Sequence, residues 1–217
     1  MKYKLRMVGG TQAIERGIVK ALVFEASRIT RSATRGIEAE IKQRFVDALK
    51  ETPEYPSLRG EGVKSLRGHF GISDIGDIDE VVYWISSLLE VVHGRAISTK
   101  AGIRTGLRLN FNYTNNFIRD VKNFQFGIQP TAKGKNLPWL SWLLFEGGKA
   151  IIKEYDVKFR VGAGRSGEAV MYHKVIARWS VPQEFQGTKD DNWITRAIDR
   201  LSPRLDAIVE KHFQKRM

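Results

Sequence analysis

The chain has 217 residues and a mass of 24.7 kDa, which predicts one compact domain, because chains divide into separate cores mainly above this size. Its 42% hydrophobic content supports a core and excludes disorder throughout, and the lack of cysteine excludes disulfide frameworks, thiolate zinc sites and cysteine catalysis. A net charge of +12, from 36 Lys and Arg against 24 Asp and Glu, favours polyanions such as nucleic acid, or an acidic protein surface.

The N-terminal residues MKYKLRMVGG lack the apolar run of a signal peptide, and no segment reaches the roughly 18 apolar residues of a membrane span. We therefore expect a soluble, intracellular protein with no membrane partner. The charge is uneven, since residues 51–100 carry five basic and eight acidic side chains and no Lys or Arg lies between Gly68 and Gly94. This stretch is the one acidic patch that the sequence predicts.

Residues 11–50 predict one long helix. Pro is absent, Thr11 suits the N-cap, and Gly36 predicts a bend or a break. The apolar residues recur in four-residue steps: Ile14, Ile18 and Leu22, then Ile29, Ala33, Ile37, Ile41 and Phe45. A helix of about 40 residues would be about 60 Å long, so its surplus length would cross a sheet or reach a neighbouring subunit.

Two segments follow this helix before the first predicted strand. Residues 51–71 are dense in Pro and Gly, which is typical of a surface loop with at most one helical turn. Residues 77–92 show the apolar spacing of an amphipathic helix, capped near Asp77 or Asp79.

The remaining elements indicate the fold class. Alternation predicts a strand over residues 104–113 and a hairpin over 155–179, with a short helix between them that begins near Asn136. The C-terminal residues 194–208 predict a helix interrupted at Ser202-Pro203. We therefore predict an α+β fold, in which an antiparallel β-sheet is packed by the long N-terminal helix and the C-terminal helix.

One pattern suggests nucleotide binding. Gly162, Gly164 and Gly167 match G-x-G-x-x-G, and Glu184 lies at a suitable distance for a ribose contact. However, residues 169–179 favour a strand where a dinucleotide fold needs a crossover helix. We therefore expect no nucleotide cofactor.

Other catalytic patterns also have simpler interpretations. Asp156-Val-Lys158, with Glu146 or Glu154, is similar to the acid and lysine set of metal-dependent nucleases, but it is also typical of a solvated strand face. The four histidines lie in separate elements without zinc-ligand spacing: His69, His93, His173 and His212. We expect no metal and no enzymatic activity.

Residues 103–126 interleave cationic with aromatic side chains, a composition suited to stacking bases beside a cationic groove. Buried strand aromatics with exposed charges explain the same pattern, so both interpretations stay open. The candidate nucleic-acid contacts are Arg104, Arg108, Arg119 and Lys122, and the aromatic residues are Phe111, Tyr113, Phe117, Phe124 and Phe126.

Taken together, the order of motifs resembles the tail-completion, or neck, proteins of tailed bacteriophages. Four short segments carry the resemblance: the helix 11–50; Pro56-Ser57-Leu58-Arg59-Gly60 with Ser65-Leu66-Arg67; Leu144-Phe145-Glu146-Gly147; and Trp179 to Thr188 followed by Asn192 to Ile198. On this basis residues 1–217 form a single neck-like domain. Residues 71–94 and 149–179 are insertions relative to the smaller members, and the aspartate and threonine common in the family's second motif are absent.

The resemblance implies a non-enzymatic virion protein, assembled in the host cytoplasm. Such proteins form a ring, sixfold by resemblance, at the head-to-tail junction, where they join the connector to the tail tube or its terminator. The implied partners are further copies of the chain, connector and tail proteins, and packaged DNA in the channel. A tail terminator or portal adaptor is one alternative, and a nucleic-acid-binding module is another.

A head-to-tail ring needs two unlike lateral surfaces. We predict that the acidic helix contacts a basic face of the next subunit or of the connector and sets the register of the encounter. The aromatic loop 179–193 either anchors an interface or folds back over the core. The candidate interface residues are Asp77, Asp79, Glu80, Phe145, Glu146, Trp179, Pro182, Phe185 and Trp193.

Overall fold

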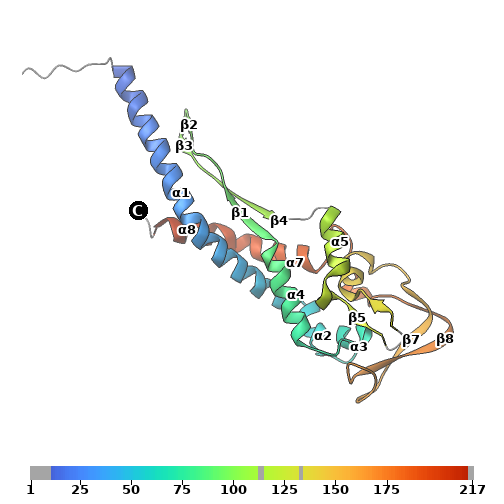
Figure 1. The fold of residues 1–217 in the computed structure, drawn as a ribbon. Helices are drawn as coiled ribbons and strands as arrows, with labels where there is room; N and C mark the ends of the chain where they lie inside the picture. The colour runs from blue at the N-terminus through green and yellow to red at the C-terminus, as the bar shows by residue number, and fades with distance from the viewer. Residues whose placement is uncertain (1–10, 112–114, 132–133, 215–217) are drawn as a thin grey trace, which may run out of the picture. The chain divides into compact units, whose positions relative to one another are not determined.

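The computed structural model describes residues 11–111, 115–131 and 134–214 (Figure 1). The predicted α+β class is confirmed, with a long N-terminal helix, small antiparallel sheets and a C-terminal helix. The strands pair as four separate two-stranded ladders: β1 with β4, β2 with β3, β5 with β6, and β7 with β8. Tyr113, expected at the end of a strand, lies outside the described residues.

Helix α1 spans Thr11–Lys50, as predicted. It is continuous through Gly36, where a bend or break was expected. A Cβ at Gly36 would come within 3.0 Å of the His212 ring, so the glycine leaves room for that side chain. The predicted apolar stripe is buried only in its later part, at Ala33, Ile37, Ile41 and Phe45.

The described residues group into two compact units, each assembled from separate stretches of the chain. Unit 1 contains residues 11–40, 90–110 and 206–214, and unit 2 contains residues 41–89, 111, 115–131 and 134–205. Chain length alone did not indicate this division.

Unit 1 combines the first part of α1 with a β arm and the C-terminal helix α8, Leu205–Gln214. Lys211 Nζ and His212 Nε2 of α8 contact the Glu40 carboxylate at 2.8 and 2.9 Å. The β arm consists of β1 (Leu89–His93), β2 (Ile97–Thr99), β3 (Gly102–Arg104) and β4 (Leu107–Phe111), with the turn between β2 and β3 at its tip (Figure 1). Its antiparallel register pairs Ile97 with Arg104.

The predicted acidic helix is shorter than expected. Helix α4 spans Gly76–Ser87, and the chain then continues into β1 instead of extending the helix to Val92. In β1, Leu89 and Val91 are buried while Glu90 is exposed. This two-residue period and the adjacent β-branched valines favour a strand.

Unit 2 contains more helix than the sequence analysis predicted. The expected loop after α1 forms two short helices, α2 (Glu54–Leu58) and α3 (Leu66–Phe70). Ser65 caps α3, because its Oγ accepts a hydrogen bond from Gly68 N at 3.0 Å. Helix α5, Asn115–Asn123, was not predicted. It is followed by the 3₁₀ turn η1, Gln125–Gly127.

Among the later elements of unit 2 the hairpin agrees with prediction, but Asn136 and Leu137, expected to begin a short helix, form a strand, and the helix begins only at Trp139. Leu137 precedes Pro138, and the residue before a proline disfavours the helical conformation. Strands β5 (Gln129–Pro130) and β6 (Asn136–Leu137) precede α6 (Trp139–Ser141), which continues as the π-helical turn η2 (Trp142–Glu146). The hairpin is formed by β7 (Ile152–Phe159) and β8 (Ala169–Trp179), followed by the 3₁₀ turn η3 (Gln183–Phe185). Helix α7 (Trp193–Leu201) is separated from α8 by the 3₁₀ turn η4 (Ser202–Arg204), so the predicted interruption is confirmed.

The β7–β8 hairpin contains a large irregularity. Lys153 pairs with Arg178, but Tyr155 pairs with His173, so β8 has four residues opposite Glu154 alone. Glu154 itself has a φ of 62°. Among the residues that bulge from β8, Val175 and Ile176 are 71% and 91% exposed.

Aromatic side chains form much of the core of unit 2. Trp193 is fully buried, and its Nε1 donates a hydrogen bond to Leu49 O at 3.1 Å. Trp84 stacks on Phe124 with a centroid distance of 4.3 Å. The largest buried side chains of this unit are Trp139, Trp193, Phe45, Phe117, Leu49, Leu58, Leu66, Ile72, Ile78, Ile85 and Leu89.

Candidate functional site

The N-terminal part of α1 exposes an apolar flank, which we define as Ile14, Ile18 and Leu22. Ile18 and Leu22 are 56% and 52% exposed, and every side chain from Gln12 to Leu22 is exposed. Four-residue spacing places the flank on one side of the helix. Single exposed apolar residues are normal, but a contiguous row on a surface indicates a contact surface.

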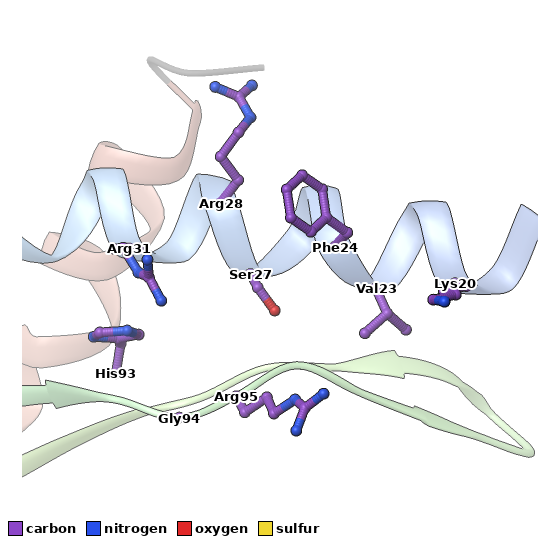
Figure 2. A pocket seen from close by; sticks show the side chains of 9 residues that line it. All are labelled: Lys20, Val23, Phe24, Ser27, Arg28, Arg31, His93, Gly94 and Arg95. Carbon is purple, nitrogen blue, oxygen red and sulfur yellow. The ribbon is translucent and has the colours of Figure 1, made fainter.

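A second surface of unit 1 is a groove between α1 and the β arm, with a volume of about 550 Å³. Figure 2 shows Val23, Ser27 and Arg31 of α1 pointing toward the arm, from which His93 points back. The residues that line this cationic groove are Lys20, Val23, Phe24, Ser27, Arg28, Arg31, His93, Gly94 and Arg95.

Hydrogen bonds hold the arm against α1 beside the cationic groove. Ala96 N donates to Ser27 Oγ at 3.3 Å, and the hydroxyls of Thr30 and Thr105 lie 3.1 Å apart. Thr30 and Ala96 are buried. The walls of the groove are therefore fixed by contacts within unit 1, so the hollow is a preformed feature of that unit.

The cationic groove contains more positive charge than its surroundings neutralise. Arg28 pairs with Glu25 of the same helix, at 2.6 Å between Nη2 and Oε1. Lys20, Arg31 and Arg95 form no ion pair with any carboxylate in the described part of the chain. Three uncompensated cations therefore surround one hollow.

The structure separates the four predicted nucleic-acid contacts into two pairs. Arg104 and Arg108 lie exposed on the β arm of unit 1. Arg119 and Lys122 lie on α5 of unit 2, where Arg119 is 3.9 Å from Asp120 and Lys122 Nζ is 3.6 Å from Glu146. The predicted cationic stretch is therefore divided between the two units, with one pair on strands and the other on a helix.

The acidic residues of α4 have different environments. Asp79 contacts Lys50 Nζ at 3.2 Å and Arg59 Nη1 at 3.0 Å, and accepts a hydrogen bond from Tyr55 at 2.7 Å. Partial burial opposes its ionisation, but the hydrogen bonds from Tyr55 and Lys50 outweigh this and lower the pKa of Asp79. Glu80 is exposed, and its carboxylate forms no ion pair within the described residues.

The pKa of Asp77 shifts in the opposite direction from that of Asp79. Partial burial and the nearby charge of Asp74 raise the pKa of Asp77, although Gln129 donates a hydrogen bond to it at 3.3 Å. Of the three acidic residues of α4 that were predicted to form an interface, Asp79 is thus committed to contacts inside unit 2, while Asp77 and Glu80 form no ion pair within the described residues.

Trp179 and Trp193 are core residues, which corrects the view of them as exposed anchors. Both are at most 5% exposed. Trp179 Nε1 donates to His69 Nδ1 at 3.3 Å, and its ring contacts Phe70 edge to face. The loop folds back over the core because both indoles find apolar neighbours and a hydrogen-bond acceptor there.

The other four predicted interface residues are half-buried. Phe145 packs edge to face on Phe117, with a centroid distance of 6.0 Å. Glu146 contacts Lys122 on α5. Pro182 and Phe185 belong to the loop before α7. A Cβ on Gly187 of this loop would overlap the Leu143 carbonyl oxygen, so the close approach to η2 requires glycine.

His69 is a feature of unit 2 that sequence reasoning did not single out. It lines a hollow of about 570 Å³ together with Lys64, Pro182 and Glu184. Burial lowers the pKa of His69 to about 4, so the imidazole is neutral at physiological pH. Its Nδ1 then accepts the Trp179 hydrogen bond. A single histidine in a Gly-rich segment gives no sequence signal for this arrangement.

The residues whose patterns suggested catalysis form a turn and an ion pair of the β7–β8 hairpin. Gly162, Gly164 and Gly167 have φ values of 76°, 69° and 73° in the turn between two antiparallel strands, with no helix following. Asp156 pairs with Lys174 across the same hairpin at 2.8 Å. In the parts of the chain that the structure describes, no group of three acidic or histidine side chains could hold a metal ion.

No helix of the described residues has the length and apolar character needed to cross a membrane. Comparisons with protein-family models, with curated proteins and with solved structures found no match.

Proposed function

We propose that this chain is a structural subunit that self-associates through the apolar flank of α1. The resemblance in the sequence suggests the assembly: a ring at the head-to-tail junction of a tailed phage, between the connector and the tail tube or terminator. The observation that carries the proposal is the exposure of Ile14, Ile18 and Leu22 in successive turns of one helix. A helix with such a surface gains little stability by itself and is stabilised by packing against another chain.

In a head-to-tail assembly the apolar flank of α1 would pack on a different surface of the next subunit and leave the cationic groove open. At 100° per residue, the apolar flank lies on a different side of α1 from Lys20, Phe24 and Arg31 of the cationic groove. Two unlike surfaces on one subunit produce heterologous contacts, which close into a ring when the rotation between neighbours allows it. A tail terminator or a portal adaptor would use the same kind of contact.

The test is the oligomeric state of the purified full chain, measured by sedimentation velocity between about 1 and 100 µM. We expect the wild type to form a closed oligomer, and the Ile18→Ser/Leu22→Ser variant to remain a monomer with unchanged far-UV circular dichroism. The matched control is Val175→Ser/Ile176→Ser, which removes two apolar side chains of unit 2 that are even more exposed. The control should assemble like the wild type.

A wild type that stays monomeric over this range, or an α1 variant that assembles normally, would overturn the proposed self-association. Electron microscopy of the assembled oligomer, and of particles that incorporate it, tests the location. Rings at the head-to-tail junction support the neck role, whereas absence from intact virions contradicts it.

A further inference from the structure

We propose that the cationic groove of unit 1 binds a single strand of nucleic acid, with backbone phosphates on Lys20, Arg31 and Arg95 and one base against Phe24. This site is independent of the apolar flank and does not require assembly. The volume of about 550 Å³ lies within the range of pockets that accept organic ligands.

The charges of the groove indicate an anionic occupant. Among the described residues that line it, four are Lys or Arg and none is Asp or Glu. Only Arg28 is compensated, by Glu25, so Lys20, Arg31 and Arg95 keep their charge. An anion between these three side chains would relieve their mutual repulsion, and phosphodiester groups supply one negative charge at each nucleotide.

The apolar wall of the groove favours nucleic acid over an acidic peptide. Phe24 is 71% exposed and lies beside Val23 at the rim of the groove, with its ring pointing away from the β arm (Figure 2). Carboxylates could neutralise the cations but would leave the phenyl ring in water. A base can cover the ring by stacking while its phosphate reaches a cation, which is the usual arrangement at sites for single strands.

The β arm extends the positive surface beyond the cationic groove. Arg95 lies just after β1, and Arg104 and Arg108 are exposed on the same arm. A strand that leaves the groove along the arm would meet these two arginines. A duplex keeps its bases paired and stacked inside, so it would contact the cations without covering Phe24.

Fluorescence anisotropy with a labelled 20-nucleotide oligothymidylate tests the proposal, using the full chain at several salt concentrations. Lys20→Gln/Arg31→Gln/Arg95→Gln should weaken binding more than 10-fold and lower the slope of log K against log salt by about 2, since each phosphate contact to a single strand contributes about 0.7. Phe24→Ala should weaken binding roughly 5-fold to 100-fold with the slope unchanged, because it removes stacking and not charge.

The matched control is Lys153→Gln/Lys158→Gln/Arg178→Gln, which removes the same charge from exposed positions of unit 2. It should bind within about 2-fold of the wild type. If the two triple variants lose the same amount of affinity for the oligothymidylate, the attraction is non-specific and the proposed site is wrong. Absence of binding by the wild type would also overturn the site, as would equal affinity for a duplex that is insensitive to Phe24→Ala.

The Ile18→Ser/Leu22→Ser background separates this inference from the proposed function. A monomeric variant that still binds oligothymidylate supports the groove whatever the role of the apolar flank. If instead the groove triple variant keeps its nucleic-acid affinity and loses self-association, the groove receives an acidic protein surface and the inference is wrong. Thermal melts followed by circular dichroism will check that each variant is folded under the conditions of the binding assay.

Discussion

The two units use similar apolar side chains to different ends. Unit 2 buries large aromatic residues in its core, including Trp139 and Trp193. The indole nitrogens of both tryptophans donate hydrogen bonds to backbone carbonyl groups. Unit 1 buries few side chains of comparable size, and much of its apolar surface is exposed. The buried apolar residues of unit 1 are Ala33, Ile37, Val91, Ala96 and Ile208.

Under the proposed function, this difference distinguishes the unit that is stabilised by its own core from the unit that would pack against another chain. Burial of apolar area is the main favourable term in folding, so unit 2 contains within itself the contacts that stabilise it. The first turns of α1 bury little in the isolated chain, and in the proposed assembly another chain would bury the same residues. Mutations in the core of unit 2 should therefore change the stability of the chain, whereas mutations of the apolar flank of α1 should change its associations.

The largest expected effect is that of Trp193→Ala in unit 2. The substitution removes a fully buried indole and its hydrogen bond to Leu49 O, so we expect a loss of about 4 kcal/mol in the free energy of unfolding, measured with urea. Trp193→Phe keeps most of the volume and should cost less than half as much. Equal values for the two variants would show that packing of this indole contributes nothing.

Arg196→Leu should cost about 3 kcal/mol in the same assay. Arg196 Nη1 pairs with the fully buried Glu54 at 2.5 Å, and Glu54 Oε2 has no hydrogen-bond donor among the described residues. Removing the arginine leaves a buried charge without compensation. The control is Arg204→Leu, which breaks the exposed pair with Glu51 and should cost less than about 1 kcal/mol. Similar losses of unfolding free energy in the two variants would show that burial of the Arg196–Glu54 pair does not increase its contribution to stability.

Acid should destabilise unit 2 through His69. The folded-state pKa of His69 is about 4 and its usual value is 6.5, so the unfolded chain takes up a proton first as the pH falls. Stability is unaffected above about pH 6.5 and decreases between pH 6.5 and 4, by about 2 kcal/mol at pH 4.5. His69→Gln should remove this component from melts at pH 7 and 4.5. An unchanged pH dependence in the variant would refute the assignment, although nearby Glu184, Lys64 and Asp156 still contribute.

The smallest expected effect on stability is that of Ile18→Ser/Leu22→Ser. Because these side chains are exposed, the unfolding free energy measured at about 1 µM should change by less than about 0.5 kcal/mol. A large loss at this concentration would mean that the flank is already buried in the single chain, and would remove the contrast between the two units.

Local patterns predicted many elements from the sequence, since they depend on neighbours along the chain. The bounds of α1, the β7–β8 hairpin and the interruption at Ser202-Pro203 follow from spacing, Gly turns and Pro. The end of α4 was placed too late because Leu88, Leu89 and Val92 continue the apolar spacing of the helix, although residues 89–93 form a strand.

The candidate sites were harder to predict, because they depend on contacts between distant residues. Trp193 resembles a loop anchor in the sequence, and only its contact with Leu49 identifies it as core. The cationic groove joins α1 to residues 93–95, about 60 positions later, so no spacing rule finds it. The exposure of Ile14 and Ile18 could not be predicted either, because the same four-residue apolar spacing continues into the part of α1 that is buried.

The bulge in β8 limits how the hairpin could join other chains. Within the described residues no third strand pairs with β7 or β8, so both are edge strands, the kind of strand that can pair with another chain. The step in register at Glu154 divides each edge into short runs, and a straight strand from another molecule could follow only one of them. The hairpin is therefore a poor template for fibril growth.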